Sequence, residues 1–150
     1  MNDNLASLLL VEDDSTDLEL FRYALGGVTS PPRLDWAKDG EEAIAYLSGH
    51  GVFSERGRHP FPDLVVLDLK LPRVSGLDVL RWIRAQPGLE TLPVTILSSS
   101  GEPRDIESAY MAGANSYLVK TSDISKMSAV VNGLCAHARL HANASSAAGR

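Results

Sequence analysis

Short runs of hydrophobic residues alternate along this chain with segments in which hydrophobic positions recur every three or four residues. Four near-continuous apolar runs are bounded by polar residues or glycine: Leu8–Val11, Leu64–Leu67, Val94–Leu97 and Tyr117–Val119. A weaker strand, Leu34–Ala37, lies between the first two. Continuous apolar runs of this length are typical of strands that are buried on both faces. The pattern therefore predicts a sheet of five strands that is covered on each side.

Each predicted strand is followed by a segment with one hydrophobic helical face. The faces are Leu18/Phe21/Ala24/Leu25, Ala43/Ile44/Leu47, Leu77/Leu80/Ile83, Ile106/Ala109/Tyr110 and Ile124/Met127/Val130/Val131/Leu134. Gly113 follows the fourth helix and is predicted to cap its carboxyl end. Strict alternation of strand and helix predicts an α/β fold, with a doubly wound parallel sheet and right-handed crossovers.

Two segments interrupt the alternation. Ser48–Pro62 is too long for a simple helix-to-strand connection and is rich in Gly, His and Arg, so it is predicted to be a mobile surface loop. After about His141 the chain becomes rich in Ala, Ser and Gly, which predicts a frayed tail. We therefore expect an N-terminal lead at 1–7, one domain at 8–136, and a helix extension with a flexible tail at 137–150. We expect no attached output module.

Composition narrows the class of protein. The chain has 150 residues, of which 44% are hydrophobic and 22% charged, as in ordinary globular domains. A formal net charge of −5 argues against general nucleic-acid binding, which needs a basic face. The single cysteine, Cys135, excludes a disulfide framework. No apolar run approaches the ~18 residues of a membrane helix, and the polar start does not look like a secretory leader, so the expected location is the cytoplasm.

Polar residues whose side chains can bind ions or take part in a reaction stand where the predicted strands end. The first strand runs into Glu12–Asp14, the third into Asp68, the fourth into Ser98 and the fifth into Lys120. The carboxyl ends of parallel strands meet at one edge of a sheet, so these side chains are expected to converge there. Carboxylates so close together repel one another unless a cation neutralises them. Because only oxygen ligands are nearby, the cation expected is a hard ion such as Mg²⁺.

These features resemble the response-regulator receiver family. The resemblance rests on four motifs in order: Leu-Leu-Val-Glu12-Asp13-Asp14, Leu-Asp68-Leu-Lys70-Leu-Pro72, Leu-Pro93-Val-x-x-x-Ser98 and Ala112-Gly113-Ala114-x-x-Tyr117-x-x-Lys120. It extends over roughly Leu8 to Leu134, and four separate motifs, each at a strand end, make it specific. It implies a flavodoxin-like sheet with strand order 2-1-3-4-5.

The resemblance also implies roles for individual residues. Asp68 is expected to accept the phosphoryl group. Glu12 and Asp13 would form the acid pair of a Mg²⁺ site with Asp68, Asp13 as a direct ligand, and the backbone carbonyl of Lys70 would complete the protein ligands. Phosphoryl transfer depends mainly on positioning and charge neutralisation, so this set is chemically sufficient.

The remaining roles concern the switch. Ser98 is expected to bind one phosphoryl oxygen and Lys120 another. Movement of Ser98 would vacate space into which Tyr117 turns, altering the surface of the fourth helix, fifth strand and fifth helix. Taken singly, Ser98 is a common turn residue, Lys120 a surface lysine and Tyr117 strand filler. Asp14 alone is predicted to be only an N-cap. Trp36 and Trp82 are interpreted as packing residues.

Three positions depart from the commonest family pattern. Lys70 is a long cation where many members carry a smaller polar residue, and Ser98 replaces a frequent threonine. Thr121 follows Lys120 where proline is usual. A cis bond before threonine would cost about 3–4 kcal/mol, so a trans bond is expected, with Thr121 to Asp123 capping the last helix.

The long loop, Lys70 and the expected absence of an output module resemble single-domain receivers paired with bacteriophytochrome histidine kinases. The expected partner is a sensor histidine kinase, and the domain is expected to be a switch rather than a turnover enzyme. A phosphate shuttle to a histidine phosphotransfer protein remains an alternative, as does a pseudo-receiver that takes no phosphate. A haloacid-dehalogenase-like hydrolase would need a carboxylate where Lys70 stands.

The partner surface is expected to include a second copy of the chain. A homodimer is predicted through the fourth helix, fifth strand and fifth helix, because an identical chain is the simplest symmetric partner. The helical pattern continues through Cys135–Leu140, past the point where the core needs covering. This surplus and Arg139 are expected to dock on a neighbouring molecule.

Overall fold

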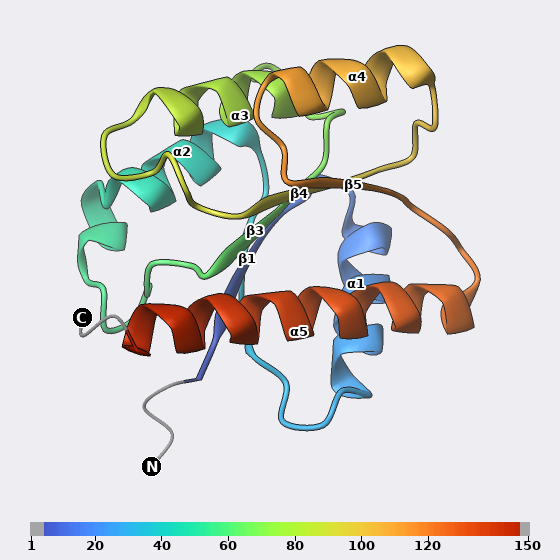
Figure 1. Ribbon diagram of the computed structural model, residues 1–150, viewed down its shortest axis with the longest axis horizontal. Coiled ribbons are helices and arrows are strands. Elements are labelled where there is room, and N and C mark those ends of the chain that lie inside the picture. Colours follow the sequence, from blue (N-terminus) through green and yellow to red (C-terminus); the bar gives the residue numbers. More distant parts are fainter. Residues whose placement is uncertain (1–4, 148–150) are drawn as a thin grey trace.

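The computed structural model describes residues 5–147 and contains one five-stranded parallel sheet between two layers of helices (Figure 1). Its strands are β1 (Ser7–Val11), β2 (Arg33–Ala37), β3 (Leu64–Leu67), β4 (Val94–Ser98) and β5 (Ser116–Val119). They lie in the order β2-β1-β3-β4-β5, and every neighbouring pair is parallel. The predicted doubly wound, flavodoxin-like sheet is confirmed. The order reverses between β1 and β3, where such folds place their ligand crevice.

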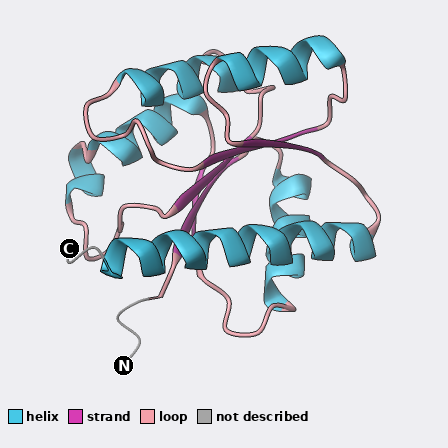
Figure 2. Cartoon of the chain, in the orientation of Figure 1, coloured by secondary structure: helices cyan, strands magenta, loops and turns pink. Residues whose placement is uncertain are grey.

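The helices separate into the two layers. They are α1 (Ser15–Gly26), α2 (Gly40–Ser48), α3 (Gly76–Ala85), α4 (Pro103–Met111) and α5 (Ile124–Ala147), with a short 3-10 helix, η1 (Gly51–Ser54). Helices α1 and α5 cover one face, where Phe21 and Val131 are buried, and α2, α3 and α4 lie on the other, with Val79 and Ile83 fully buried (Figure 2). Two apolar layers therefore hold the sheet rigid beneath the strand ends.

Burial differs between the central and the outer strands. All residues of β1, β3 and β4 are buried, whereas β5 is only partly covered and Val119 is 46% exposed. The prediction of burial on both faces is therefore wrong for β5. As an edge strand it has a neighbour on one side only, and its surface faces outward beside α4 and α5.

Polar caps begin the helices next to the site. The Asp14 carboxylate accepts hydrogen bonds from the backbone N–H of Thr16 and Asp17, so its predicted N-cap role is confirmed. The Lys120–Thr121 bond is trans, as expected. The N–H of Asp123 donates to the Thr121 hydroxyl, and the Asp123 carboxylate accepts from the N–H of Lys126. Thr121 and Asp123 thus form the predicted cap of α5.

The loop Ser48–Pro62 is anchored to the body, which corrects its interpretation as a mobile excursion. The Arg56 guanidinium donates to the carbonyls of Tyr46 at 2.9 Å and Leu47 at 3.1 Å. The Tyr46 hydroxyl donates to the Pro60 carbonyl at 2.9 Å. Arg56 donates hydrogen bonds to carbonyls in the last turn of α2, so this one basic residue attaches the loop to the helix.

The carboxyl-terminal part of α5 also differs from the prediction. The helix continues to Ala147, so the frayed tail expected after His141 is wrong over this part, where alanine favours helix. Cys135 and Ala138 are fully buried, and Arg139 donates to the carbonyls of Thr29 and Ser30 of its own chain. The extension expected to dock on a neighbour therefore largely covers the sheet beside α1.

The ends of the predicted lead and tail, 1–4 and 148–150, lie outside the described residues. Within 5–147, none of the helices has both the length and the apolar character needed to cross a membrane.

Candidate functional site

Three carboxylates meet at the carboxyl ends of β1 and β3. Glu12 and Asp13 follow β1, Asp68 follows β3, and one oxygen from each lies within 4.8 Å of the others. Glu12 is 2% exposed and Asp68 5%, whereas Asp13 faces the solvent. Two buried acids beside an open one form a site with oxygen donors and an access route. This donor set fits a hard divalent cation that retains part of its water shell.

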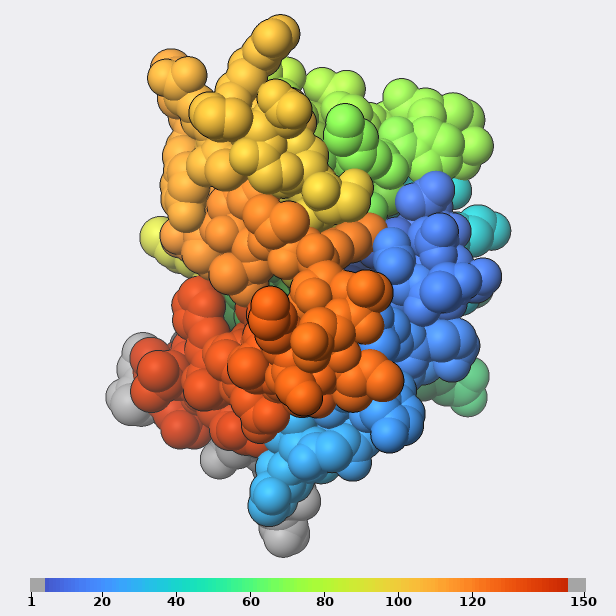
Figure 3. All heavy atoms as spheres, turned by 90° about the vertical axis from the view of Figure 1, so that its right-hand side faces the viewer, coloured from blue at the N-terminus to red at the C-terminus, as the bar shows by residue number. Residues whose placement is uncertain are grey.

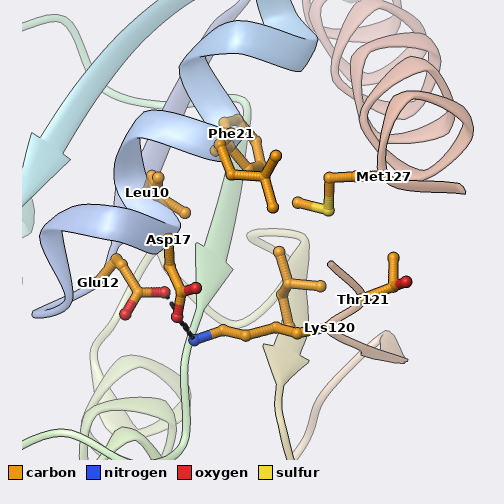
Figure 4. Close-up of a pocket in the computed structure, with 9 residues that line it drawn as sticks. Leu10, Glu12, Asp17, Phe21, Lys120, Thr121 and Met127 are labelled. Atoms are coloured by element: carbon orange, nitrogen blue, oxygen red, sulfur yellow. Dashed lines mark hydrogen bonds and ion pairs between the residues drawn. The ribbon is translucent and has the colours of Figure 1, made fainter. Parts of the chain in front are cut away.

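Lys120 supplies the positive charge of the site from the end of β5. Its Nζ lies 2.8 Å from Asp68 Oδ2. The same atom lies 2.9 Å from Glu12 Oε1 and 2.7 Å from Asp17 Oδ2, two residues that Figure 4 shows beside it. Burial opposes the charged form of this lysine. Hydrogen bonds with Asp17, Asp68 and Glu12 outweigh that effect and raise the pKa of the Lys120 ammonium. The ammonium therefore stays charged while it neutralises part of the acidic cluster.

The environment of Glu12 favours the neutral form of its carboxyl. Burial raises the pKa of its carboxyl from 4.5 to about 7, although hydrogen bonds with Lys120 and the N–H of Asp14 oppose the shift. The repulsion from Asp68 acts in the same direction as burial. A carboxyl in this position gains from a nearby cation, because the cation would stabilise the ionised form.

The loop after Asp68 is closely packed against it. The N–H of Lys70 donates to Asp68 Oδ1 at 3.1 Å, and the Lys70 side chain is exposed. The N–H of Gly76, the first residue of α3, donates to the carbonyl of Leu69 at 3.0 Å. An added Cβ at Gly76 would lie 2.0 Å from the carbonyl oxygen of Asp68. Only glycine allows α3 to begin this close to the acid.

Ser98 and Tyr117 are joined through the loop between β4 and α4. Ser98 is fully buried at the end of β4, and its hydroxyl accepts from the N–H of Ser100 at 3.3 Å. The half-buried Tyr117 donates its hydroxyl to the carbonyl of Ser100 at 2.7 Å. Displacement of Ser98 would thus be passed through Ser100 to the Tyr117 hydroxyl. Whether the ring turns inward stays a prediction.

Two residues of the site escaped the sequence analysis. Asp17 is the third partner of Lys120, and the signal that was present is its place four residues after Asp13, in the first turn of α1. Trp36, interpreted as packing, donates its indole N–H to the carbonyl of Glu12 at 2.7 Å. Trp36 pairs with Leu10 in the register of β2 and β1, which only the folded sheet reveals.

The sequence model of one protein family, the response regulator receiver domain, matches residues 8–132 of this chain. The chain belongs to the response regulator receiver family. Its relatives include response regulator Rcp1 of Synechocystis sp., which is 33% identical over 127 residues, covering 85% of this chain and 84% of Rcp1. The matched range includes all the strand-end residues described above.

Solved structures give the same result. The phosphorylated cyanobacterial phytochrome response regulator RcpA is 35% identical, with a TM-score of 0.79 over 87% of this chain and 91% of RcpA. The Mn²⁺-bound form of Rcp1 is 32% identical, with a TM-score of 0.76 over 86% of this chain and 91% of that one. The resemblance to receivers paired with phytochromes is thereby confirmed.

Proposed function

We propose that this receiver domain is a phosphorylation-controlled switch whose acceptor is Asp68. The observation that carries the proposal is the 2.8 Å contact between Asp68 Oδ2 and Lys120 Nζ, beside the cluster of Glu12, Asp13 and Asp68. An ammonium and a cation-binding cluster around one buried carboxylate suit the transfer of a strongly anionic group. The phosphorylated form of RcpA and the Mn²⁺-bound form of Rcp1 support the same reading of this chain.

The resident cation proposed is Mg²⁺, held by Glu12, Asp13, Asp68 and the backbone carbonyl of Lys70. When bound, it supplies charge neutralisation for the phosphoryl oxygens. The Asp68 carboxylate oxygen forms a bond to phosphorus while the phosphorus–nitrogen bond of a phosphohistidine breaks. The electron pair of that bond stays with the imidazole, which takes up a proton. The product on this chain is an acyl phosphate.

The lysine and serine then respond to the new charge. Lys120 pairs with one phosphoryl oxygen, and the Ser98 hydroxyl donates to another. Because the Ser98 hydroxyl accepts from the N–H of Ser100, its reorientation releases that contact. The hydrogen bond from Tyr117 to Ser100 carries the change to the outer side of β5 and α4. The domain signals by this change in surface rather than by turnover of a substrate.

A sensor histidine kinase of the phytochrome class is the proposed phosphodonor, in the cytoplasm. RcpA is a phytochrome response regulator, which supports the assignment. Onward transfer to a histidine phosphotransfer protein is compatible with the same site. The solvent-exposed Lys70 has no carboxyl with which to act as the acid of a hydrolase. The complete set of Asp13, Asp68 and Lys120 argues against a pseudo-receiver.

Labelling with a small phosphodonor tests the proposal. With Mg²⁺ and radiolabelled acetyl phosphate, the wild-type chain should gain one hydroxylamine-sensitive phosphoryl group, and Asp68→Asn should gain none. Asp78→Asn, on the outer face of α3, removes the same charge outside the site and should be labelled normally. Undiminished labelling of the Asp68→Asn variant would contradict the assignment.

We further propose that the domain acts as a homodimer through α4, β5 and α5. The face carries Met111, which is 82% exposed, together with Val119 and Ile124 at 46% and 53%. Leu140, on the extension of α5, is 69% exposed. Because Cys135 and Ala138 are buried in the same chain, the apolar surface available to a partner is smaller than the sequence pattern indicates.

A further inference from the structure

The three carboxylates that contact Lys120 differ in their position relative to the cation cluster. Glu12 and Asp68 belong to the cluster of carboxylates that can hold a divalent cation, whereas Asp17 does not. The Asp17 side chain is 37% exposed, against 3% for Glu12 and 6% for Asp68. It therefore lies at the rim of the site, on the side of α1. Lys120 bridges this rim and the buried cluster.

The position of Asp17 is set by the start of α1. Its N–H donates to Asp14 Oδ1 at 3.0 Å, so the N-cap holds the first turn in place. In Figure 3 the beginning of α1, in blue, lies against the orange segment that leads from β5 into α5. The contact of 2.7 Å between Asp17 Oδ2 and Lys120 Nζ joins these two segments. The geometry is thus held by elements outside the cation cluster.

Lys120 and a divalent cation compete for the same two carboxylates. The ammonium contacts Glu12 Oε1 and Asp68 Oδ2, and a cation held by the same carboxylates would repel the ammonium and weaken these two contacts. The Lys120 side chain is only 16% exposed, and its stem borders a small cavity with Leu10, Phe21 and Met127 (Figure 4). These apolar residues offer the ammonium no alternative partner. A buried ammonium without one is strongly unfavourable.

We propose that Asp17 is the positioning residue that retains Lys120 when the lysine releases Glu12 and Asp68 to a divalent cation. This inference rests on the proposed function of the same site. Asp17 lowers the cost of moving the ammonium, so it strengthens cation binding. It also keeps the ammonium beside Asp68, where one N–H remains available for an incoming phosphoryl oxygen.

A competing explanation is that Asp17 acts only as a nearby negative charge. Removing any carboxylate close to the cluster would weaken cation binding through space. The two explanations differ when the lysine is absent. Retention of Lys120 predicts that Asp17 matters only while Lys120 is present, whereas a simple charge effect persists or grows once Lys120 no longer neutralises Asp17. A double-mutant cycle separates them.

The experiment is calorimetric titration of the metal-free chain with Mg²⁺ alone, with no phosphodonor. The variants are Asp17→Ala, Lys120→Met and the double variant. We expect Asp17→Ala to raise the Mg²⁺ dissociation constant about tenfold in the presence of Lys120 and less than about twofold in the Lys120→Met background. Glu19→Ala is the matched control, because Glu19 lies on α1, carries the same charge and pairs with Arg22 instead.

Equal or larger weakening by Asp17→Ala in the Lys120→Met background would overturn the inference, and so would no weakening in either background. A wild-type chain that binds no Mg²⁺ would overturn the proposed function as well, whereas intact Mg²⁺ binding without coupling would overturn only the role of Asp17. If thermal unfolding shows that Asp17→Ala is not folded, the cycle is run with Asp17→Asn. That variant keeps an oxygen acceptor and should show the same pattern at smaller amplitude.

Discussion

Replacement of Gly76 by alanine tests whether the stability of the domain requires the close packing of α3 against Asp68, the proposed acceptor. Gly76 begins α3, and an added Cβ would lie 2.0 Å from the carbonyl oxygen of Asp68 and 2.7 Å from the Cα of Leu69. Both atoms belong to the backbone, so no side-chain rotation relieves the overlap. Either α3 or the loop that follows Asp68 has to move.

The expected loss of stability is large for a single methyl group. Overpacking in a well-packed interior costs typically 1–3 kcal/mol, and contact with rigid backbone places Gly76→Ala near the upper limit, about 3 kcal/mol. A domain of ordinary stability has only about 5–15 kcal/mol in total. Since the displaced backbone carries Asp68, the rate of labelling by acetyl phosphate should fall as well.

Urea unfolding followed by circular dichroism measures the effect. Gly133→Ala is the control, because Gly133 lies inside α5 and a Cβ there meets nothing within 4 Å. Alanine favours helix over glycine, so this variant should be more stable than the wild type by roughly 0.5–1 kcal/mol. The reasoning is refuted if Gly76→Ala unfolds within 1 kcal/mol of the wild type and is labelled at the same rate.

Three further predictions follow from other parts of the molecule. Arg84→Ala should destabilise the chain by about 3 kcal/mol, because its guanidinium donates to three backbone carbonyls and Asn115, whereas Arg81→Ala on the outer face of α3 should cost less than about 1 kcal/mol in urea unfolding. The folded-state pKa of Glu12 is raised from 4.5 to about 7, so protonation of this carboxyl stabilises the folded state. This contribution to the free energy of unfolding is fully present below pH 4.5 and is lost as the pH rises through about 7. Urea unfolding in EDTA across this range should therefore show a decline that Glu12→Gln flattens, and parallel curves would contradict it. Light scattering at micromolar concentration should give a dimeric mass for the full chain and a smaller one for Leu140→Glu, whose side chain is exposed, and a monomeric mass for the full chain would exclude the dimer.

Much of the fold was predictable because its signals are local. A buried strand of a parallel sheet needs several consecutive apolar residues, and Leu8–Val11 and Leu64–Leu67 satisfy that requirement without knowledge of their neighbours. The acids that follow these strands lie at the carboxyl edge of the sheet because the strands end there. The convergence of Glu12, Asp68 and Lys120 therefore followed from the order of motifs along the chain.

Features that depend on one particular long-range contact were not predictable in this way. Arg56 reads as a charged loop residue, and only its position beneath Tyr46 and Leu47 shows that it anchors the loop. The alanine-rich end of α5 carries no strong pattern, and Ala138 is buried because it belongs to the apolar cluster that α5 shares with α1. In both cases the contact depends on how distant elements pack.

Asp17 shows the same division within the site. By sequence it is an acid in the first turn of a helix, where its negative charge interacts favourably with the helix dipole. Its contact with Lys120 joins positions that are 103 residues apart and exists only because α1 begins at the edge of the sheet where β5 ends. Sequence alone determined which chemical groups stand at the strand ends. The tertiary structure decided which of the carboxylates share the lysine, because that depends on distances between separate elements.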